Sequence, residues 1–238
     1  TNDGSQLLSR DKYTWSQGRF VWTFARLAML DAPVFSQKQK GDFLDLARSG
    51  LEFLKKHCLV GPDDWRCVYL MDEKGQPKTA DDSGRLDLSI YADCFVIGAF
   101  ARYALAAADR PAYAFASRLY QSALDRIKSG DYLTHPYPLS EQYRAHGIPM
   151  IMSNVTCEMI QVAASLDPAF ALPDAALAPL ERGLIAFVEG RIQRDFWSPR
   201  ADLDLRKLAA IEALSRYGKA TPRMLDSITL APNQWPTH

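Results

Sequence analysis

The segment from Ser89 to about Ala107 is the feature of this sequence that most limits its fold. As a helix it would be apolar on nearly every face, and such a helix is stable only where neighbouring elements cover most of its surface. A chain of 238 residues is long enough to build that cover, as one sizeable core or two small ones. We therefore expect an inner helix at the centre of a helical protein.

Apolar and amphipathic segments alternate along the rest of the chain. A first helix follows Trp15 and runs to about Ala28, and a second inner helix is expected over about 149–164. The amphipathic helices, each with one charged face, are expected over 43–54, 115–127 and 174–193, with one further helix over about 203–217. The alternation predicts an all-α fold, a toroid of helical hairpins of the α/α-barrel type. An irregular helical bundle is the alternative.

One β-hairpin is expected in this helical frame. Residues 67–71 and 76–79 flank the turn Asp72-Glu73-Lys74-Gly75, and this is the only strand signal that we accept. The long segments 59–88 and 130–148 are rich in Gly, Pro and Asp. We expect them to lie on one rim of the toroid and to build a site there.

Charge and cysteine usage exclude several classes of function. The chain has 28 basic and 28 acidic side chains, so no net charge favours nucleic acid or an anionic membrane. Its four cysteines have no C-x-x-C spacing, which predicts neither a zinc module nor a disulfide framework and favours a reducing cytoplasm. No apolar run of about 18 residues is expected to cross a bilayer, because Asp93 and Arg102 interrupt the best candidate.

The strongest candidate site residues stand at the starts of two expected helices. Arg19 lies among Trp15, Gln17 and Trp22, where a guanidinium held by indole rings could bind sugar or carboxylate oxygens. An arginine that merely covers an aromatic core is equally compatible with this pattern. Tyr91 and Asp93 begin the apolar helix. A carboxylate there is either functional or a first-turn residue stabilised by the helix N-terminus.

A second group of candidates lies near the expected helix 149–164. Asn154 and Glu158 stand one turn apart on a mainly apolar surface, either to bind a ligand or to hydrogen-bond a neighbouring helix. His146, in the loop before them, could act as a general base, although most lone loop histidines have no such role. No His or carboxylate spacing in the sequence suggests a metal site.

Four stretches in order resemble the N-acylglucosamine 2-epimerase family. Residues 15–22 are similar to its W-x-Q-G-R-x-x-W signature, and 89–95 and 148–154 are similar to its inner helices around Tyr91-Ala92-Asp93 and Pro149-Met150. Lys74-Gly75-Gln76-Pro77 is similar to its strand motif. The resemblance covers residues 5 to about 205 and implies an (α/α)6 barrel with one small β-hairpin.

The resemblance also implies an activity and a set of site residues. It implies an isomerase without a cofactor that interconverts C2 epimers such as N-acetylglucosamine and N-acetylmannosamine, or an aldose and a ketose, with histidines as acid and base. Arg19 would be catalytic by polarising the sugar carbonyl. Trp22, Tyr91, Asp93, Met150 and Asn154 would line the substrate site.

The chain departs from the family pattern toward its end. From about Arg206 to His238 the resemblance is lost, and the N-P-G-H-x-x-E motif that carries a catalytic histidine in the family is absent from the sequence. We expect a single, partial barrel domain over 1–238 that is truncated at both ends, with a frameshift as the hypothesis for residues 206–238. Exposed inner-helix faces would then favour a homodimer, aggregation or a partner.

Two other classes of function stay open from the residues alone. A glycoside-cleaving toroid would need two carboxylates about 5 to 9 Å apart, and the candidates are Asp87, Asp93, Glu141 and Glu158. A catalytically inactive remnant that binds a partner would need none of them.

Overall fold

A computed structural model describes residues 5–137, 144–145, 147–165, 182–183, 185 and 228–229 of the chain. The chain divides into two compact units, which are described separately. The first contains residues Thr1–Pro136 and Gln161–Ala171, and the second contains Tyr137–Ile160 and Leu172–His238. The prediction of a single barrel domain over 1–238 stays a prediction.

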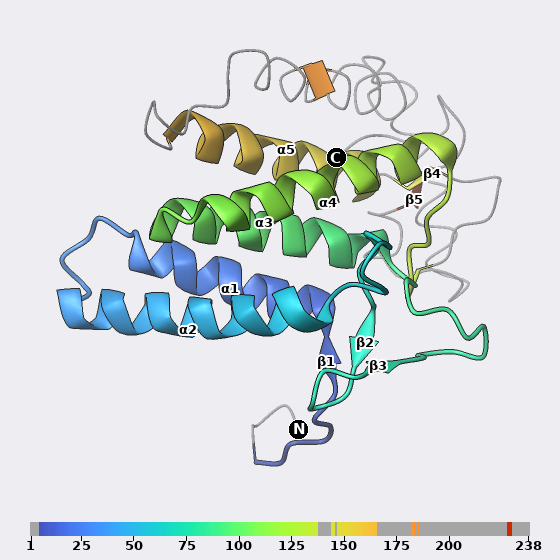
Figure 1. Cartoon of the computed structure of the whole chain (residues 1–238), viewed down its shortest axis with the longest axis horizontal. Helices are drawn as coiled ribbons and strands as arrows, with labels where there is room; N and C mark the ends of the chain where they lie inside the picture. Colours follow the sequence, from blue (N-terminus) through green and yellow to red (C-terminus); the bar gives the residue numbers. More distant parts are fainter. Residues whose placement is uncertain are drawn as a thin grey trace, which may run out of the picture. The chain divides into compact units, whose positions relative to one another are not determined.

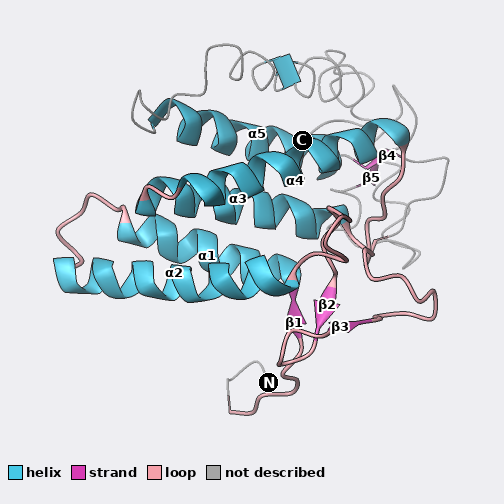
Figure 2. Ribbon diagram, viewed as in Figure 1, coloured by secondary structure: helices cyan, strands magenta, loops and turns pink. Residues whose placement is uncertain are grey.

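Four helices form the body of the first unit, as the periodicity predicts (Figure 1). The helix α1 contacts both α2 and α3, and α3 contacts α4. Figure 2 shows the small sheet at the end of the unit where α1 begins. The bounds of the helices are Thr14–Ala28 for α1, Gln37–His57 for α2, Ile90–Ala107 for α3 and Arg110–Ser129 for α4.

Local sequence signals set the ends of the outer helices. Ser36 and Gln39 form a capping box at the start of α2, so both satisfy backbone N–H groups that the first turn leaves unpaired. Asp109 caps α4 by accepting a hydrogen bond from the Ala112 N–H at 3.0 Å, and a proline stands in the first turn. The helix α4 ends at Gly130, whose positive φ of 78° closes it.

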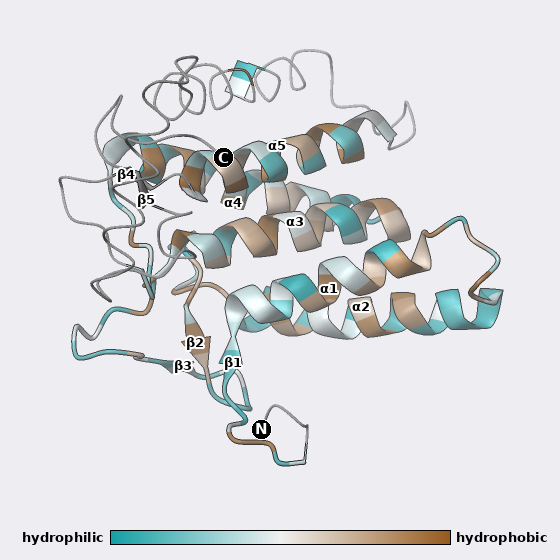
Figure 3. Cartoon of the chain, turned by 180° about the vertical axis from the view of Figure 1, so that it is seen from behind, coloured by the Kyte–Doolittle hydropathy of each residue, from teal (hydrophilic) through white to brown (hydrophobic). Residues whose placement is uncertain are grey.

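The inner helix α3 is buried along most of its length. Apolar residues predominate along it, whereas α2 alternates between polar and apolar residues (Figure 3). By length and mean hydropathy α3 could cross a membrane, contrary to the expectation that Asp93 and Arg102 break the run. However, 67% of these 18 residues are buried inside the protein, and the core helices of folded proteins can have the same length and hydropathy.

Gly18 allows α1 and α3 to approach backbone to backbone. A Cβ at this position would lie 2.8 Å from the carbonyl carbon and oxygen of Phe95, which is closer than real Cβ contacts allow. The missing side chain therefore fixes how α1 and α3 meet, and with it the positions of Arg19 and Phe95 on the two facing helices.

The predicted hairpin is present and gains a third strand. The strands β2, Leu70–Met71, and β3, Pro77–Lys78, pair antiparallel around a turn in which Gly75 has φ +87°. The additional strand β1, Lys12–Tyr13, pairs with β2 on its other edge, with Tyr13 opposite Leu70. Two residues are too few to give a strand period, so the sequence did not predict β1.

The second unit contains most of α5, Gly147–Ser165, where the second inner helix was predicted. It also contains the two-residue strands β4, Arg144–Ala145, and β5, Ile228–Thr229, which pair antiparallel. The helices predicted over 174–193 and 203–217 lie outside the described residues, apart from helical positions 182, 183 and 185.

Candidate functional site

Arg19, near the start of α1, packs against two aromatic rings. Its guanidinium carbon lies 4.9 Å from the centre of the Trp15 ring and 4.4 Å from the centre of the Phe95 ring. The two rings are themselves 6.2 Å apart. Arg19 is exposed, so its hydrogen-bond donors remain accessible while the rings restrict its orientation. The aromatic environment predicted for Arg19 is present, with Phe95 beside Trp15, and its catalytic role stays a prediction.

Trp22 lies on the same face of α1, one turn beyond Arg19. A Cβ added at Gly98 would contact its Cδ1 at 3.9 Å, so the indole lies over α3. The guanidinium of Arg26 stands 5.7 Å from its ring, and Trp22 is 37% exposed. The α1 face that carries Trp15, Arg19 and Trp22 therefore meets the α3 face that carries Phe95 and Gly98.

Tyr91 occupies the first turn of α3, one turn before Phe95 and on the same face of that helix. It is half-buried. Burial raises the pKa of its phenol to about 12, because the phenolate would lose solvation. Tyr91 therefore keeps its proton at neutral pH and can act as a hydrogen-bond donor.

Asp93 points into the protein instead. It is 1% exposed, and its Oδ1 accepts hydrogen bonds from Arg126 Nη2 at 2.6 Å and from the Cys67 backbone N–H at 3.1 Å. Burial raises the pKa of this carboxyl to about 6, although the charge and hydrogen bond of Arg126 act in the opposite direction. Asp93 is thus a buried, paired residue in the first turn of α3, and the substrate-lining role that the resemblance implied stays a prediction.

The loops 59–88 and 130–137 meet at the start of α3, as predicted for the rim. Arg66 bridges them through ion pairs with Asp87 at 3.2 Å and Asp131 at 2.8 Å. Main-chain bonds add to this link, from the Tyr69 N–H to the Leu86 carbonyl at 2.6 Å and from the His135 N–H to the Leu88 carbonyl at 2.9 Å. The part of the second segment from 138 to 148 lies largely outside the described residues.

Sequence reasoning missed several residues of this region. Phe95 could have been found, because it follows Tyr91 by one helical turn. Arg126 gives no such signal, since it lies 33 residues from Asp93 on another helix. Tyr69 and His135, whose rings are 5.0 Å apart, are also distant in sequence and are joined only by the folding of the two loops.

The other predicted residues belong to the second unit. Met150 and Asn154 stand one turn apart on α5 and are both exposed, Met150 to 54%. Glu158, a further turn along, is 8% exposed. His146 and Glu141 lie outside the described residues.

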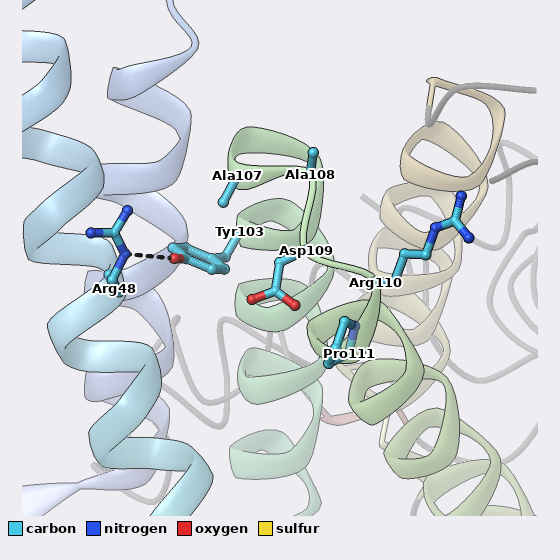
Figure 4. Close-up of a pocket in the computed structure, with 7 residues that line it drawn as sticks. All are labelled: Arg48, Tyr103, Ala107, Ala108, Asp109, Arg110 and Pro111. Atoms are coloured by element: carbon cyan, nitrogen blue, oxygen red, sulfur yellow. Dashed lines mark hydrogen bonds between the residues drawn. The ribbon is translucent and has the colours of Figure 1, made fainter. Parts of the chain in front are cut away.

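A cavity of about 490 Å³ lies at the opposite end of α3 (Figure 4). Its lining includes Arg48, whose Nε donates to the Tyr103 hydroxyl at 3.2 Å, and Asp109, the cap of α4. The side chain of Arg110 points away from Arg48. Ten residues separate Asp93 from Tyr103, or about 15 Å along the helix, so this cavity is distinct from the surroundings of Arg19.

No group of three or more His, Cys, Asp or Glu side chains is arranged to hold a metal ion within the described ranges. The residues at Arg19 supply a fixed cation and aromatic faces, and Tyr91, one helical turn before Phe95, supplies a phenol. These groups suit an oxygen-rich ligand that carries or develops negative charge.

Comparison with known sequences gives one family. The sequence profile of N-acylglucosamine 2-epimerase matches residues 1–182 of the chain. The rat N-acylglucosamine 2-epimerase is 30% identical over 90 residues, which cover 38% of this chain and 19% of that protein. The human protein of the same name is 31% identical over 84 residues, 35% of this chain and 17% of that protein. The matched segments thus span less than a fifth of these relatives.

Comparison with solved structures shows the fold. The cellobiose 2-epimerase of Bacillus thermoamylovorans has a TM-score of 0.54 at 14% identity, over 83% of this chain and 48% of that one. The cellobiose 2-epimerase of Spirochaeta thermophila has a TM-score of 0.52 at 17% identity, over 91% of this chain and 57% of that one. The likeness confirms the predicted fold class, all-α of the (α/α)6 type with a small hairpin.

Proposed function

The chain belongs to the N-acylglucosamine 2-epimerase family, and from that premise we propose that it carries part of the active site of a sugar epimerase or aldose–ketose isomerase. The observation that carries this proposal is the exposed guanidinium of Arg19, packed against the rings of Trp15 and Phe95. The family's name and the names of the similar proteins point to sugars as the class of substrate.

The chemistry proposed for this site is proton transfer at the carbon next to the carbonyl of an open-chain sugar. A base removes the C2 proton, and the electron pair moves onto the carbonyl oxygen to give an enediolate. Return of the proton to the other face of C2 gives the epimer. Transfer of the O2 proton to O1 and return of the abstracted proton to C1 gives the ketose, with the new carbonyl at C2. The charge develops on oxygen, so a fixed cation lowers the barrier.

Arg19 would supply that cation as the catalytic residue. The half-exposed ring of Trp22 and the protonated phenol of Tyr91 would contact the sugar, through its apolar face and a hydroxyl respectively. Met150 and Asn154 are proposed as further lining residues on α5. The acid and base are proposed to be histidines, as the resemblance implies.

We also propose a reducing cytoplasm as the location and a free sugar as the partner, with no cofactor. The state of the cysteines supports the location: all four are thiols in the described part of the chain.

Exchange of the C2 proton tests the proposed reaction directly. The purified chain is incubated in deuterium oxide with N-acetylmannosamine and with mannose, and loss of the C2 proton signal is followed by NMR. We expect exchange in the wild type and a loss of about 100-fold or more in Arg19→Ala, because one charge-stabilising donor is removed.

Arg118→Ala is the matched control. The guanidinium of Arg118 also stacks on an indole, that of Trp65 at 4.3 Å, but from the outer helix α4. Its removal should leave exchange unchanged. A folded wild type that exchanges neither sugar, or an Arg19→Ala variant as active as Arg118→Ala, would refute the proposed function.

One observation favours a second candidate, a protein that binds a partner or a second copy without catalysis. Apolar side chains near the end of α1 and in the following loop are exposed, including Met29 at 40%, Leu30 at 41% and Val34 at 68%. Concentration-dependent association together with the absence of exchange would favour it. A glycosidase is not favoured, since Asp87 and Asp93 are both engaged in ion pairs.

A further inference from the structure

We propose that the buried pair Asp93–Arg126 is a positioning device for the proposed sugar site, which holds the start of α1 in place so that Trp15 supports Arg19. The effect of this pair on catalysis rests on the proposed function. Its structural content, the link from Asp93 to Trp15, can be tested without activity.

The first step of the link is the pair itself. Arg126 of α4 and Asp93 of α3 are 2.6 Å apart, with side chains 10% and 1% exposed. The same Arg126 nitrogen also donates to the Trp65 carbonyl at 3.4 Å, and Ser122 Oγ donates to that carbonyl at 2.7 Å. A buried pair with these added hydrogen bonds is fixed in geometry, and removal of one partner leaves an uncompensated charge.

The second step leads from Asp93 into an extended segment. Asp93 accepts a hydrogen bond from the Cys67 N–H. The Val68 N–H donates to the Cys58 carbonyl at 2.8 Å, and the Tyr69 N–H donates to the Leu86 carbonyl at 2.6 Å. Every N–H from 67 to 69 therefore has a partner in a different part of the unit. The segment has little freedom to move while Asp93 holds its beginning.

The third step reaches α1. The Tyr69 carbonyl accepts a hydrogen bond from the N–H of Thr14, the first residue of α1, at 3.1 Å. Trp15 packs against the cluster of Tyr69, Leu70 and Leu88. The segment that Asp93 holds is thus the support for Trp15, whose ring in turn contacts Arg19.

Asp93 and Phe95, both on α3, connect the buried pair to Arg19 by two different routes. They are two residues apart on α3 and lie on opposite sides of it. Asp93 bonds to α4 and the loop, whereas Phe95 contacts Arg19. The same turn of α3 therefore sets both rings that hold Arg19, Phe95 directly and Trp15 through the segment 67–69.

Fluorine NMR of the full chain labelled with 5-fluorotryptophan measures the link. Asp93→Asn keeps the size of the side chain and removes its charge, and Arg126→Lys keeps the charge and removes the planar fork. In both variants we expect the Trp15 resonance to move and the Trp22 resonance, two turns along α1, to stay in place. Asp45→Asn, which breaks the exposed pair Asp45–Arg48, should move neither.

Two results would overturn the proposal: a Trp15 resonance at its wild-type position in both variants, or equal movement of the Trp15 and Trp22 resonances, which indicates general loosening. Should Asp93→Asn not fold, Arg126→Lys decides alone.

Kinetics separate this inference from the proposed function. If the wild type exchanges the C2 proton, Asp93→Asn should lower kcat by about ten-fold or more and change KM little, because Arg19 acts on the developing charge. An unchanged kcat would contradict a positioning role. If the wild type shows no exchange, the proposed function fails, and the fluorine spectra still decide on the link.

Discussion

Asp87 and Asp93 lie on either side of the start of α3, and their pKa values shift in opposite directions. Burial raises the pKa of Asp93 to about 6 in spite of Arg126. Burial alone would raise the pKa of Asp87 as well, but hydrogen bonds from Arg85 and Arg66 outweigh it and lower the pKa. The balance between lost solvation and the charged partners decides the sign at each carboxyl.

This difference predicts how pH changes stability. Between about pH 4 and pH 6 native Asp93 keeps a proton that the unfolded chain has already lost. Unfolding therefore releases a proton, and a rise in pH favours unfolding. The free energy of unfolding of the wild type should fall relative to that of Asp93→Asn over this range, by about 3 kcal/mol at most, and then stay level. Urea unfolding at a series of pH values measures it.

Asp87→Asn provides the comparison of opposite sign. The lowered pKa of Asp87 stabilises the fold above the unfolded pKa, and this contribution is lost as pH falls through the native value. The wild type should therefore lose its advantage over Asp87→Asn only below about pH 4. A difference between wild type and Asp93→Asn that is flat from pH 4 to 6 would contradict the raised pKa.

The sequence marked Asp93 as unusual but could not supply its partner. A carboxylate in an apolar helix requires compensation, and that argument needs only the neighbours in sequence. Arg126 shares the helical spacing of the buried residues Leu119 and Ala123, but spacing within α4 cannot show that it pairs with Asp93. That pairing depends on the packing of α4 on α3. The Arg19 environment was more accessible, because Trp15 and Trp22 are its helical neighbours.

At the scale of elements, Gly18 predicts a difference between two glycine substitutions. Gly18→Ala would place a methyl group 2.8 Å from the backbone of Phe95, so α1 and α3 must separate. We expect a loss of about 1–3 kcal/mol in the free energy of unfolding, although alanine is the better helix former. Chemical denaturation followed by circular dichroism measures it.

Gly41→Ala is the matched substitution in α2. A Cβ there would meet nothing within 4 Å, so only helix propensity acts and the variant should gain about 0.5–1 kcal/mol. A Gly18→Ala variant as stable as Gly41→Ala would contradict the close backbone contact between α1 and α3.

The elements themselves were largely predictable, for a physical reason that differs among them. A stripe of apolar residues at helical spacing, as in 115–127, reports the one buried face of α4, and the uniform apolar character of α3 reports burial on most sides. The sequence of β1 contains no comparable pattern, because Lys12 and Tyr13 form a strand only by pairing with Met71 and Leu70. Long-range pairing leaves no local period.

At the scale of the whole molecule, the cysteines distinguish the folded from the unfolded chain. Cys58, Cys67 and Cys94 are buried in the first unit, and Cys157 on α5 is partly exposed. Burial raises the pKa of the Cys67 and Cys94 thiols, so few of these thiols ionise. A maleimide should label one thiol quickly in the native protein and all four in denaturant, as counted by mass spectrometry.

Cys157→Ser removes the fast site and should abolish rapid labelling. Rapid modification of two or more thiols in the native wild type, or an unchanged fast site in Cys157→Ser, would show that the core of the first unit is open.

The link from Asp93 to α1 consists of main-chain groups at every step after the first. A main-chain N–H or carbonyl is present whatever the side chain, so residues 67–69 could exchange one buried side chain for another in the course of evolution and keep their hydrogen bonds. Asp93 and Arg126 do not have this freedom, since either one alone leaves a buried charge. The two residues should therefore change together among proteins that keep this segment, whereas residues 67–69 can vary separately.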